Sequence, residues 1–302
     1  MLFKKAIIMI CHPNAKINLG LNVTERRPDG YHNLETIFYP IPICDTLSVE
    51  IATEASSGSG RNIFPTQCNI ITQECDDYIL RTAGIDIDCP AEKNLIIKAL
   101  RLLKKEFDIP RLQIDMYKQI PSGAGLGGGS SDAAYMMRTL NEMFHLQLSH
   151  PELEERAATL GADCAFFIRN EAVFATGIGN IFTPCDISLQ GWTLVLVKPE
   201  VFVSTKEAYA GITPHHPDTS ITNITLRPIE EWKETLKNDF EEGIFKLHPI
   251  VADIKEELYR LGAYYAAMSG SGSSVFGLFR TPLNEVQLES TFGKHFWKQY
   301  TL

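Results

Sequence analysis

Polar and apolar residues alternate from Ala15 to Val23, with the two-residue period of a half-buried β-strand. Lys16, Asn18 and Asn22 occupy its polar face. The apolar run at residues 6–11 precedes this segment and predicts a buried first strand. The N-terminal part of the chain is therefore expected to begin a sheet.

The rest of the chain mixes helical and strand-like patterns. Asn94 can cap a helix that runs through Phe107. Segment 53–92 has no clear period, and Ser56–Gly60 is expected to be its flexible tip. Because helices and strands do not alternate regularly, the pattern indicates an α+β fold rather than a doubly wound sheet. Further strands are expected at 39–52, 112–120, 172–175 and 192–197, a strand–loop–strand unit at 264–279, and helices through 136–140 and at 151–161, 204–211, 228–246 and 250–261.

A glycine- and serine-rich segment between a predicted strand and a predicted helix carries the strongest functional signal. Glycine lets a ligand approach the main chain closely, and a helix N-terminus presents unpaired N–H groups, so this arrangement favours a bound phosphate. The segment is not a Walker A loop, since no Lys-Ser or Lys-Thr follows its glycines. It fits G-x-G-x-x-G, but the second strand and acidic residue of a dinucleotide site are missing. The predicted cradle consists of Pro121, Ser122, Gly123, Ala124, Gly125, Leu126, Gly127, Gly128, Gly129, Ser130 and Ser131.

A solvated glycine-rich linker is the alternative interpretation of this segment. Pro121 and the apolar helical pattern after Asp132 argue against it, because linkers do not usually open an amphipathic helix.

Composition narrows the class of protein. A chain of 302 residues can form two lobes, and a net charge of −9 gives no general attraction to nucleic acid or anionic membranes. Seven cysteines occur singly and without a C-x-x-C pair, which favours reduced thiols. The N-terminal apolar run is too short for a signal peptide, and no segment is long enough to span a bilayer, so a cytoplasmic location is expected.

Three motifs in order resemble those of the GHMP kinase superfamily. Pro13–Leu19 is similar to the first, Pro121–Ala134 to the nucleotide-binding second, with two extra glycines, and Ala267–Gly277 to the third. The resemblance spans almost the whole chain. It implies a two-lobed α+β fold with the active site in the cleft between the lobes. It also implies an ATP-binding domain at 1–165 and a substrate-binding domain at 166–302.

Two further segments narrow the resemblance within the superfamily. Arg26–Leu34 and Leu160–Phe167 are similar to segments of the kinases that act on 4-diphosphocytidyl-2-C-methyl-D-erythritol. This resemblance implies transfer of the γ-phosphoryl group of ATP to the 2-hydroxyl of that alcohol, in the non-mevalonate isoprenoid pathway. Mg²⁺ is expected on chemical grounds because it neutralises triphosphate charge, although no protein ligand for it can be named.

Two residues are candidates for the chemistry. Asp163 is expected at a helix end before the apolar Ala165–Phe167, where partial desolvation makes a carboxylate more basic. Taken alone, a helix-end aspartate satisfied by backbone amides is the simpler interpretation, and Lys16 could be a solvated lysine. The resemblance implies instead that Asp163 is the catalytic aspartate, and that Lys16 pairs with it and stabilises the transferring group.

Four residues are candidates for acceptor binding. The ring of Tyr31 can stack on a pyrimidine, and His32 can exchange hydrogen bonds with its edge. A core tyrosine beside a turn histidine is the alternative. The resemblance places a second aromatic at Tyr209, where phenylalanine is also frequent, and a substrate-contacting asparagine at Asn18.

Two other functions stay open at this point. The first is a GHMP kinase for mevalonate, homoserine or a sugar, in which Tyr31 and His32 would have no base to bind. The second is a nucleotide-binding regulator that has lost catalysis, against which the presence of both Lys16 and Asp163 argues. The sequence predicts a small-molecule partner and does not indicate an oligomeric state.

Overall fold

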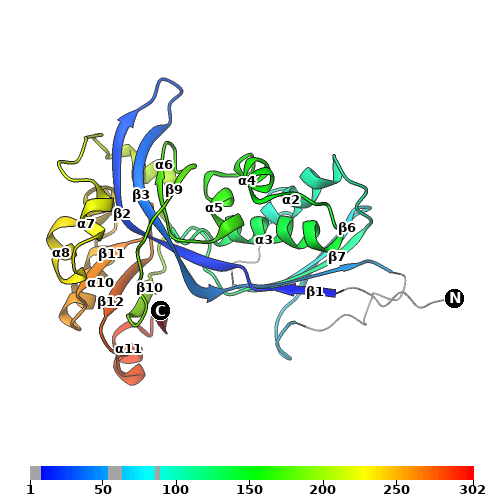
Figure 1. Ribbon diagram of the computed structural model, residues 1–302. Helices are drawn as coiled ribbons and strands as arrows, with labels where there is room; N and C mark the ends of the chain where they lie inside the picture. Colours follow the sequence, from blue (N-terminus) through cyan, green and yellow to red (C-terminus); the bar gives the residue numbers. More distant parts are fainter. Residues whose placement is uncertain (1–7, 54–62, 86–88) are drawn as a thin grey trace. The chain divides into compact units, whose positions relative to one another are not determined.

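The computed structural model describes residues 8–53, 63–85 and 89–302, and the chain forms two compact units that interleave along the sequence (Figure 1). Since neither unit is one continuous segment, the predicted boundary at residue 165 between an ATP-binding and a substrate-binding domain remains a proposal. The first unit contains Met1–Ala15, Ile43–Ser122 and Gly127–Asn170, and the second contains Lys16–Pro42, Gly123–Leu126 and Glu171–Leu302.

The first unit is a five-stranded sheet with a group of packed helices on one side (Figure 1). The strand order is β1-β4-β7-β6-β5, and only β6 and β7 among these neighbours run parallel. Its strands are β1 (Ile8–Cys11), β4 (Thr46–Ile51), β5 (Ile71–Glu74), β6 (Tyr78–Gly84) and β7 (Leu112–Lys118), and its helices are α2 (Leu95–Lys104), α3 (Gly128–Met143), α4 (His150–Ala158) and α5 (Ala162–Arg169).

Local sequence explains where these helices begin. The side chain of Asn94 accepts a hydrogen bond from Ile96 N and caps α2 as predicted. Ser149 and Glu152 form a reciprocal capping box at α4, with Pro151 in the first turn. Both caps satisfy N–H groups that the helices themselves leave unpaired.

The second unit contains a four-stranded sheet of order β11-β12-β10-β13. A second sheet, β2-β3-β8-β9, includes two long strands that start or end in the first unit. The strands are β2 (Asn14–Arg26), β3 (His32–Cys44), β8 (Val173–Thr176), β9 (Ile181–Pro184), β10 (Thr193–Lys198), β11 (Tyr265–Met268), β12 (Val275–Phe279) and β13 (Phe296–Thr301). The helices are α6 (Thr205–Ala210), α7 (Ile221–Thr225), η1 (Ile229–Glu231), α8 (Trp232–Thr235), α9 (Phe240–Leu247), α10 (Pro249–Arg260) and α11 (Glu285–Phe292).

The α+β class is confirmed, but several local predictions are wrong. β1 is an edge strand and only half-buried, because β4 is its one strand neighbour among the described residues. β2 is buried on both faces from Asn14 to Val23, so its polar side chains do not form a solvated face. Segment 53–92 contributes β5 and β6 to the sheet, while its tip at Ser56–Gly60 lies outside the described residues.

The predicted helix at 228–246 is also wrong. The structure divides it into η1, α8 and α9, and the break lies where residues 237–239 pair with β2 through hydrogen bonds to Leu21. Tertiary pairing thus overrides helix propensity at this point. None of the described helices combines the length and apolar character that a membrane span needs.

Candidate active site

The glycine-rich segment connects β7 to α3 as predicted, and its backbone adopts angles that favour glycine. Gly123, Gly125 and Gly127 have φ of 59°, 75° and 70°. Gly127 is the N-cap of α3 and no side chain caps this helix, whose first turn contains no acidic residue. The first N–H groups of α3 and the positive end of its dipole are therefore available to an anion.

A buried cluster of charges fixes the start of this loop in the first unit. Lys118, at the end of β7, donates to both Asp45 and Asp132. One oxygen of Asp45 accepts the backbone N–H groups of Gln119 and Ile120. This carboxylate therefore orients the main chain as it leaves the strand for the loop.

A cavity of about 170 Å³ adjoins the cluster and the loop within the first unit. Its lining includes Asn94, Ser122 and Gly129 as well as Lys118 and Asp132. Burial raises the pKa of the Asp132 carboxyl to about 8, despite the lowering effect of Lys118. Within the described structure, Oδ1 of Asp132 has no hydrogen-bond partner. The cavity thus offers an unsatisfied polar group beside the anion-binding loop.

The tip of the loop, Gly123–Leu126, belongs to the second unit and packs against the third motif. Ser269 Oγ donates to Gly125 O at 2.9 Å, and Ser274 N donates to Ala124 O at 3.2 Å. A Cβ atom at Gly125 would lie 1.9 Å from Ser269 O, so only glycine fits there. The third motif therefore supports the loop.

Lys16 begins a chain of hydrogen bonds inside the second unit. Its Nζ donates to Asn18 Oδ1 at 2.7 Å, and Asn18 Nδ2 donates to Thr36 Oγ1 at 2.9 Å. Thr36 in turn donates to Gly20 O at 2.6 Å. Lys16 also lies 4.8 Å from the centre of the Phe38 ring. These contacts fix the position of a buried ammonium group, which is not the solvated lysine of the alternative interpretation.

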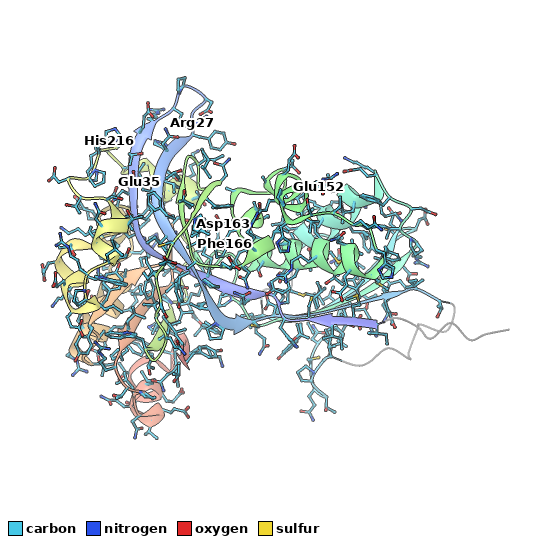
Figure 2. All side chains as sticks on the ribbon, viewed as in Figure 1. Arg27, Glu35, Glu152, Asp163, Phe166 and His216 are labelled. Atoms are coloured by element: carbon cyan, nitrogen blue, oxygen red, sulfur yellow. The ribbon has the colours of Figure 1, made fainter. Side chains whose placement is uncertain are left out.

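Asp163 lies in the first turn of α5, and Figure 2 shows it close to Phe166 on the same helix. Asp163 thus lies at a helix end as expected, but at the start of a new helix, since α4 stops at Ala158 and α5 begins at Ala162. The helix N-terminus stabilises a carboxylate at this position. The next three residues of α5, Cys164, Ala165 and Phe166, are buried.

At the C-terminal end of α5, hydrogen bonds hold the helix against the rest of the first unit. Asn170, which caps the C-terminus of α5 with φ of 61°, donates through Nδ2 to Asn14 Oδ1 at 2.8 Å. Tyr135 of α3 donates to the same oxygen at 2.9 Å. The helix that carries Asp163 is thus tied both to α3 and to the start of β2.

His32 and Tyr209, far apart in sequence, are in contact in the second unit. Their rings stack with centroids 4.7 Å apart and an interplanar angle of 20°. Phe240 contacts the Tyr209 ring edge-to-face at 4.8 Å. Tyr31 lies in the turn between β2 and β3 and is 62% exposed, and Figure 2 places Arg27 in this same hairpin. The hairpin therefore presents one ring to solvent and one to Tyr209.

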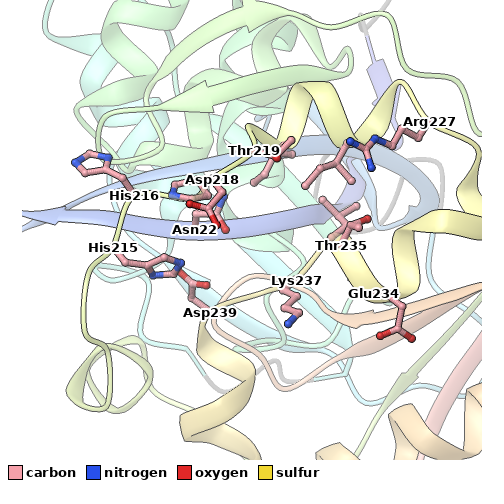
Figure 3. Close-up of a pocket in the computed structure, with 14 residues that line it drawn as sticks. Asn22, His215, His216, Asp218, Thr219, Arg227, Glu234, Thr235, Lys237 and Asp239 are labelled. Carbon is pink, nitrogen blue, oxygen red and sulfur yellow. The ribbon is translucent and has the colours of Figure 1, made fainter.

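The second unit contains another cavity, of about 470 Å³, beside β2 (Figure 3). His215 faces Asp239 there, with Nδ1 and Oδ2 3.7 Å apart. Its charged lining groups are Arg227 and Lys237 against Asp218, Glu234 and Asp239, with two histidines. Because its three carboxylates outnumber the two side chains that are always cationic, Arg227 and Lys237, this cavity is poorly suited to a polyphosphate.

Asp45, Lys118 and Asp132 shape the loop but are not among the residues predicted from the sequence. Lys118 and Asp132 flank the glycine-rich segment closely, so their positions were a usable signal. Asp45 is 73 residues from Lys118 along the chain, and only the pairing of β4 with β7 brings it there.

With this geometry established, comparison with known proteins defines the class. Residues 94–171 match the GHMP kinases N terminal domain, and residues 220–296 match the GHMP kinases C terminal model. A mevalonate kinase from Methanococcus jannaschii has the same fold, with a TM-score of 0.63, 15% identity and 99% and 98% of the two chains covered. The protein is a GHMP kinase by fold and by sequence.

More similar relatives define the family within that class. A 4-diphosphocytidyl-2-C-methyl-D-erythritol kinase from Bacteroides fragilis is 53% identical over 286 residues, 94% of this chain and 97% of the relative. The enzyme of that name from Bacteroides thetaiotaomicron is 55% identical over 271 residues, 90% and 92% of the chains. A crystal structure of a 4-(cytidine 5'-diphospho)-2C-methyl-D-erythritol kinase superimposes with a TM-score of 0.76 and 29% identity, covering 96% and 98%. The chain belongs to the 4-diphosphocytidyl-2-C-methyl-D-erythritol kinase family.

Proposed function

We propose that the protein transfers the γ-phosphoryl group of ATP to the 2-hydroxyl of 4-diphosphocytidyl-2-C-methyl-D-erythritol. The observation that carries the kinase reaction is the positive-φ glycine loop that leads into the uncapped N-terminus of α3. The acceptor is inferred from the names of relatives that match over more than nine-tenths of their length.

ATP is assigned to the loop and the cavity that adjoins it. The phosphates bind the main-chain N–H groups at the start of α3, from Gly128 onward. The adenine base enters the 170 Å³ cavity, where the unpaired Oδ1 of Asp132 and the unpaired hydroxyl of Thr82 can exchange hydrogen bonds with it.

Mg²⁺ would be held mainly by the triphosphate. Among the described residues, no group of three or more histidine, cysteine, aspartate or glutamate side chains forms a metal site of its own. An ion carried mainly by phosphate oxygens and water suits such a site, and it neutralises phosphate charge during transfer.

Phosphoryl transfer then requires two kinds of help from the protein. Asp163 orients the acceptor hydroxyl and takes up its proton as the new P–O bond forms and the bond from the γ-phosphorus to the leaving ADP breaks. The fixed ammonium of Lys16 neutralises charge that develops on the transferring group, while Asn18 holds Lys16 and contacts the acceptor.

The cytosine is assigned to the aromatic group formed by Tyr31, His32 and Tyr209. In the structure, His32 stacks on Tyr209, whose ring also contacts Phe240. We infer that the base replaces the imidazole on the face of Tyr209 and that the exposed Tyr31 covers its other face. The displaced His32 is then free to bind the polar edge of the base.

Replacing Tyr31 or Tyr209 with alanine is expected to weaken binding of the cytidine acceptor and to leave ATP affinity nearly unchanged. Each lost stack corresponds to about 1–3 kcal/mol, by analogy with aromatic stacking on single-stranded nucleic acid. His32→Ala should in addition reduce the preference for cytidine- over uridine-linked acceptors. Calorimetric titration with CDP, UDP and an ATP analogue measures all three effects. Unchanged CDP affinity in every variant would mean that the cytosine does not bind to Tyr31, His32 and Tyr209.

Gly127→Val is expected to abolish nucleotide binding in a folded protein, because a β-branched residue cannot adopt a φ of 70° without strain. Titration with a non-hydrolysable ATP analogue measures the loss. Gly191→Val is the matched control, since Gly191 has a φ of 82° and open space around it. If Gly127→Val bound the analogue as tightly as Gly191→Val, the triphosphate would have to lie elsewhere.

A screen of ADP release against alcohols tests the proposed function. Wild-type protein with ATP and Mg²⁺ should release ADP rapidly with the cytidine-linked acceptor and slowly with mevalonate, homoserine, sugars or methylerythritol without cytidine. Equal rates with an acceptor that lacks cytidine would favour another GHMP kinase activity. If no acceptor led to release of ADP, the result would favour a nucleotide-binding regulator that has lost catalysis.

We propose a cytoplasmic enzyme with small-molecule substrates and neither a nucleic-acid nor a membrane partner, in keeping with the net charge of −9 and seven cysteines in the free thiol state.

A further inference from the structure

Helix α6, which carries Tyr209, is too short to be stable alone. It has six residues, whereas isolated helices generally need about 12–15 residues even to be marginally stable in water. Its position therefore depends on contacts with the rest of the second unit. Ser204 caps its first turn by accepting a hydrogen bond from Glu207 N at 3.1 Å.

Two contacts attach α6 to the two ends of α9. Tyr209 meets Phe240, the first residue of α9, edge-to-face at 4.8 Å. Glu207 Oε1 lies 3.0 Å from Nε2 of His248, the residue that ends α9 and precedes α10. Two separated contacts between two elements fix an orientation, which one contact cannot do.

The pair formed by Glu207 and His248 has the chemistry of a strong positioning contact. A carboxylate can only accept, so Nε2 of His248 carries the donated proton. The side chains are 33% and 22% exposed, which shields the pair from solvent more than most surface ion pairs. A glutamate three residues after a serine cap often binds the N-cap N–H, but here it reaches across to α9.

We propose that Glu207 and His248 are positioning residues for acceptor binding, which hold α6 so that Tyr209 presents its ring to the cytosine. This inference rests on the proposed base site. His32 must leave the face of Tyr209 when the base enters, and that exchange removes an aromatic contact of the ring, while the contact with Phe240 stays. The attachment of Glu207 to His248 keeps α6 in place while the exchange occurs.

Glu207 and His248 are not part of the sites assigned to ATP and to the cytosine. Neither side chain lines the ATP cavity, and neither stacks with His32 or Tyr209. Removing the pair should therefore weaken acceptor binding while ATP affinity and the rate at saturating acceptor stay close to those of the wild type.

The experiment is a double-mutant cycle read by titration with CDP and with a non-hydrolysable ATP analogue. Glu207→Ala and His248→Ala should each weaken CDP binding by about 3- to 10-fold, within the range of coupling measured between interacting residues. Glu207→Gln retains an acceptor oxygen and should recover most of the affinity. In a Tyr209→Ala background, Glu207→Ala should cause no further loss, because its effect acts through the ring.

Glu242→Ala is the matched control. Glu242 lies on α9 and pairs with Lys246, but both side chains are largely exposed, at 83% and 72%, and this pair does not involve α6. The control should bind CDP like the wild type. Unchanged ATP-analogue affinity shows that each variant is folded, and His248→Gln replaces any variant that fails this criterion.

Two outcomes overturn the proposal in different ways. If Tyr209→Ala weakens CDP binding but Glu207→Ala and His248→Gln do not, the positioning role is wrong and the base site stands. If the losses from Glu207→Ala and Tyr209→Ala add fully, the glutamate acts independently of the ring. If wild-type protein does not bind CDP at all, the base site itself fails and this inference fails with it.

Discussion

Asp163→Asn should lower the turnover rate by about 10²–10⁴-fold, the usual contribution of a general base. The substitution keeps the shape of the side chain but removes the negative charge that orients and deprotonates the acceptor hydroxyl. ATP binding should change little, because the loop and the cavity assigned to ATP do not include Asp163. Steady-state rates at saturating substrates, with titration of an ATP analogue, measure the two effects separately.

Asp253→Asn provides the control for this substitution. Asp253 is an exposed residue of α10. Its replacement with asparagine makes the same chemical change as Asp163→Asn, but away from the proposed site. It should retain the wild-type rate. A rate for Asp163→Asn close to that of the control would remove Asp163 from the mechanism.

Lys16→Ala should lower turnover by about 10²–10³-fold, comparable to the loss of one preorganised group that stabilises transition-state charge. The effect on turnover should exceed the effect on acceptor affinity, since the ammonium matters most as charge shifts during transfer. Because Lys16 is 97% buried, replacing it with alanine also leaves a cavity where its side chain packs beside β2.

Lys16→Met separates the lost charge from the lost volume. Methionine fills most of the same space, so both variants should be slow if the charge is responsible. If Lys16→Met restored most of the rate, Lys16 would act by packing. If only the Michaelis constant for ATP rose, Lys16 would instead be a ground-state contact to phosphate.

Local sequence predicted the glycine loop and the cap of α2, because the chemistry of both is local. Asn94 caps α2, and the loop joins β7 to α3. In each case the residue type is required by nearby backbone geometry.

The same reasoning failed for β2 because period alone does not show what covers a strand. Lys16, Asn18 and Asn22 suggested a solvated face, yet each is buried. Lys16 and Asn18 are satisfied by one another and by Thr36, a residue of the neighbouring strand β3. A buried polar network resembles an exposed polar face in sequence, and only strand pairing distinguishes them.

The positioning contacts were also beyond sequence reasoning. Asp45 is brought to the loop by the pairing of β4 with β7, and Glu207 meets His248 only because α6 lies beside α9. Such contacts depend on tertiary structure, and no residue near Asp45 or Glu207 in the sequence indicates its partner.

The measurement that tests the central claim most directly is proton-coupled phosphorus NMR of the reaction with ATP, Mg²⁺ and 4-diphosphocytidyl-2-C-methyl-D-erythritol. The account predicts a new phosphomonoester signal that appears with ADP and shows no three-bond coupling to hydrogen, because carbon 2 bears a methyl group and no hydrogen. The signal should be absent with Asp163→Asn over the same period. A split phosphomonoester signal would place the phosphate on another hydroxyl, and ADP without any phosphomonoester would contradict the kinase assignment.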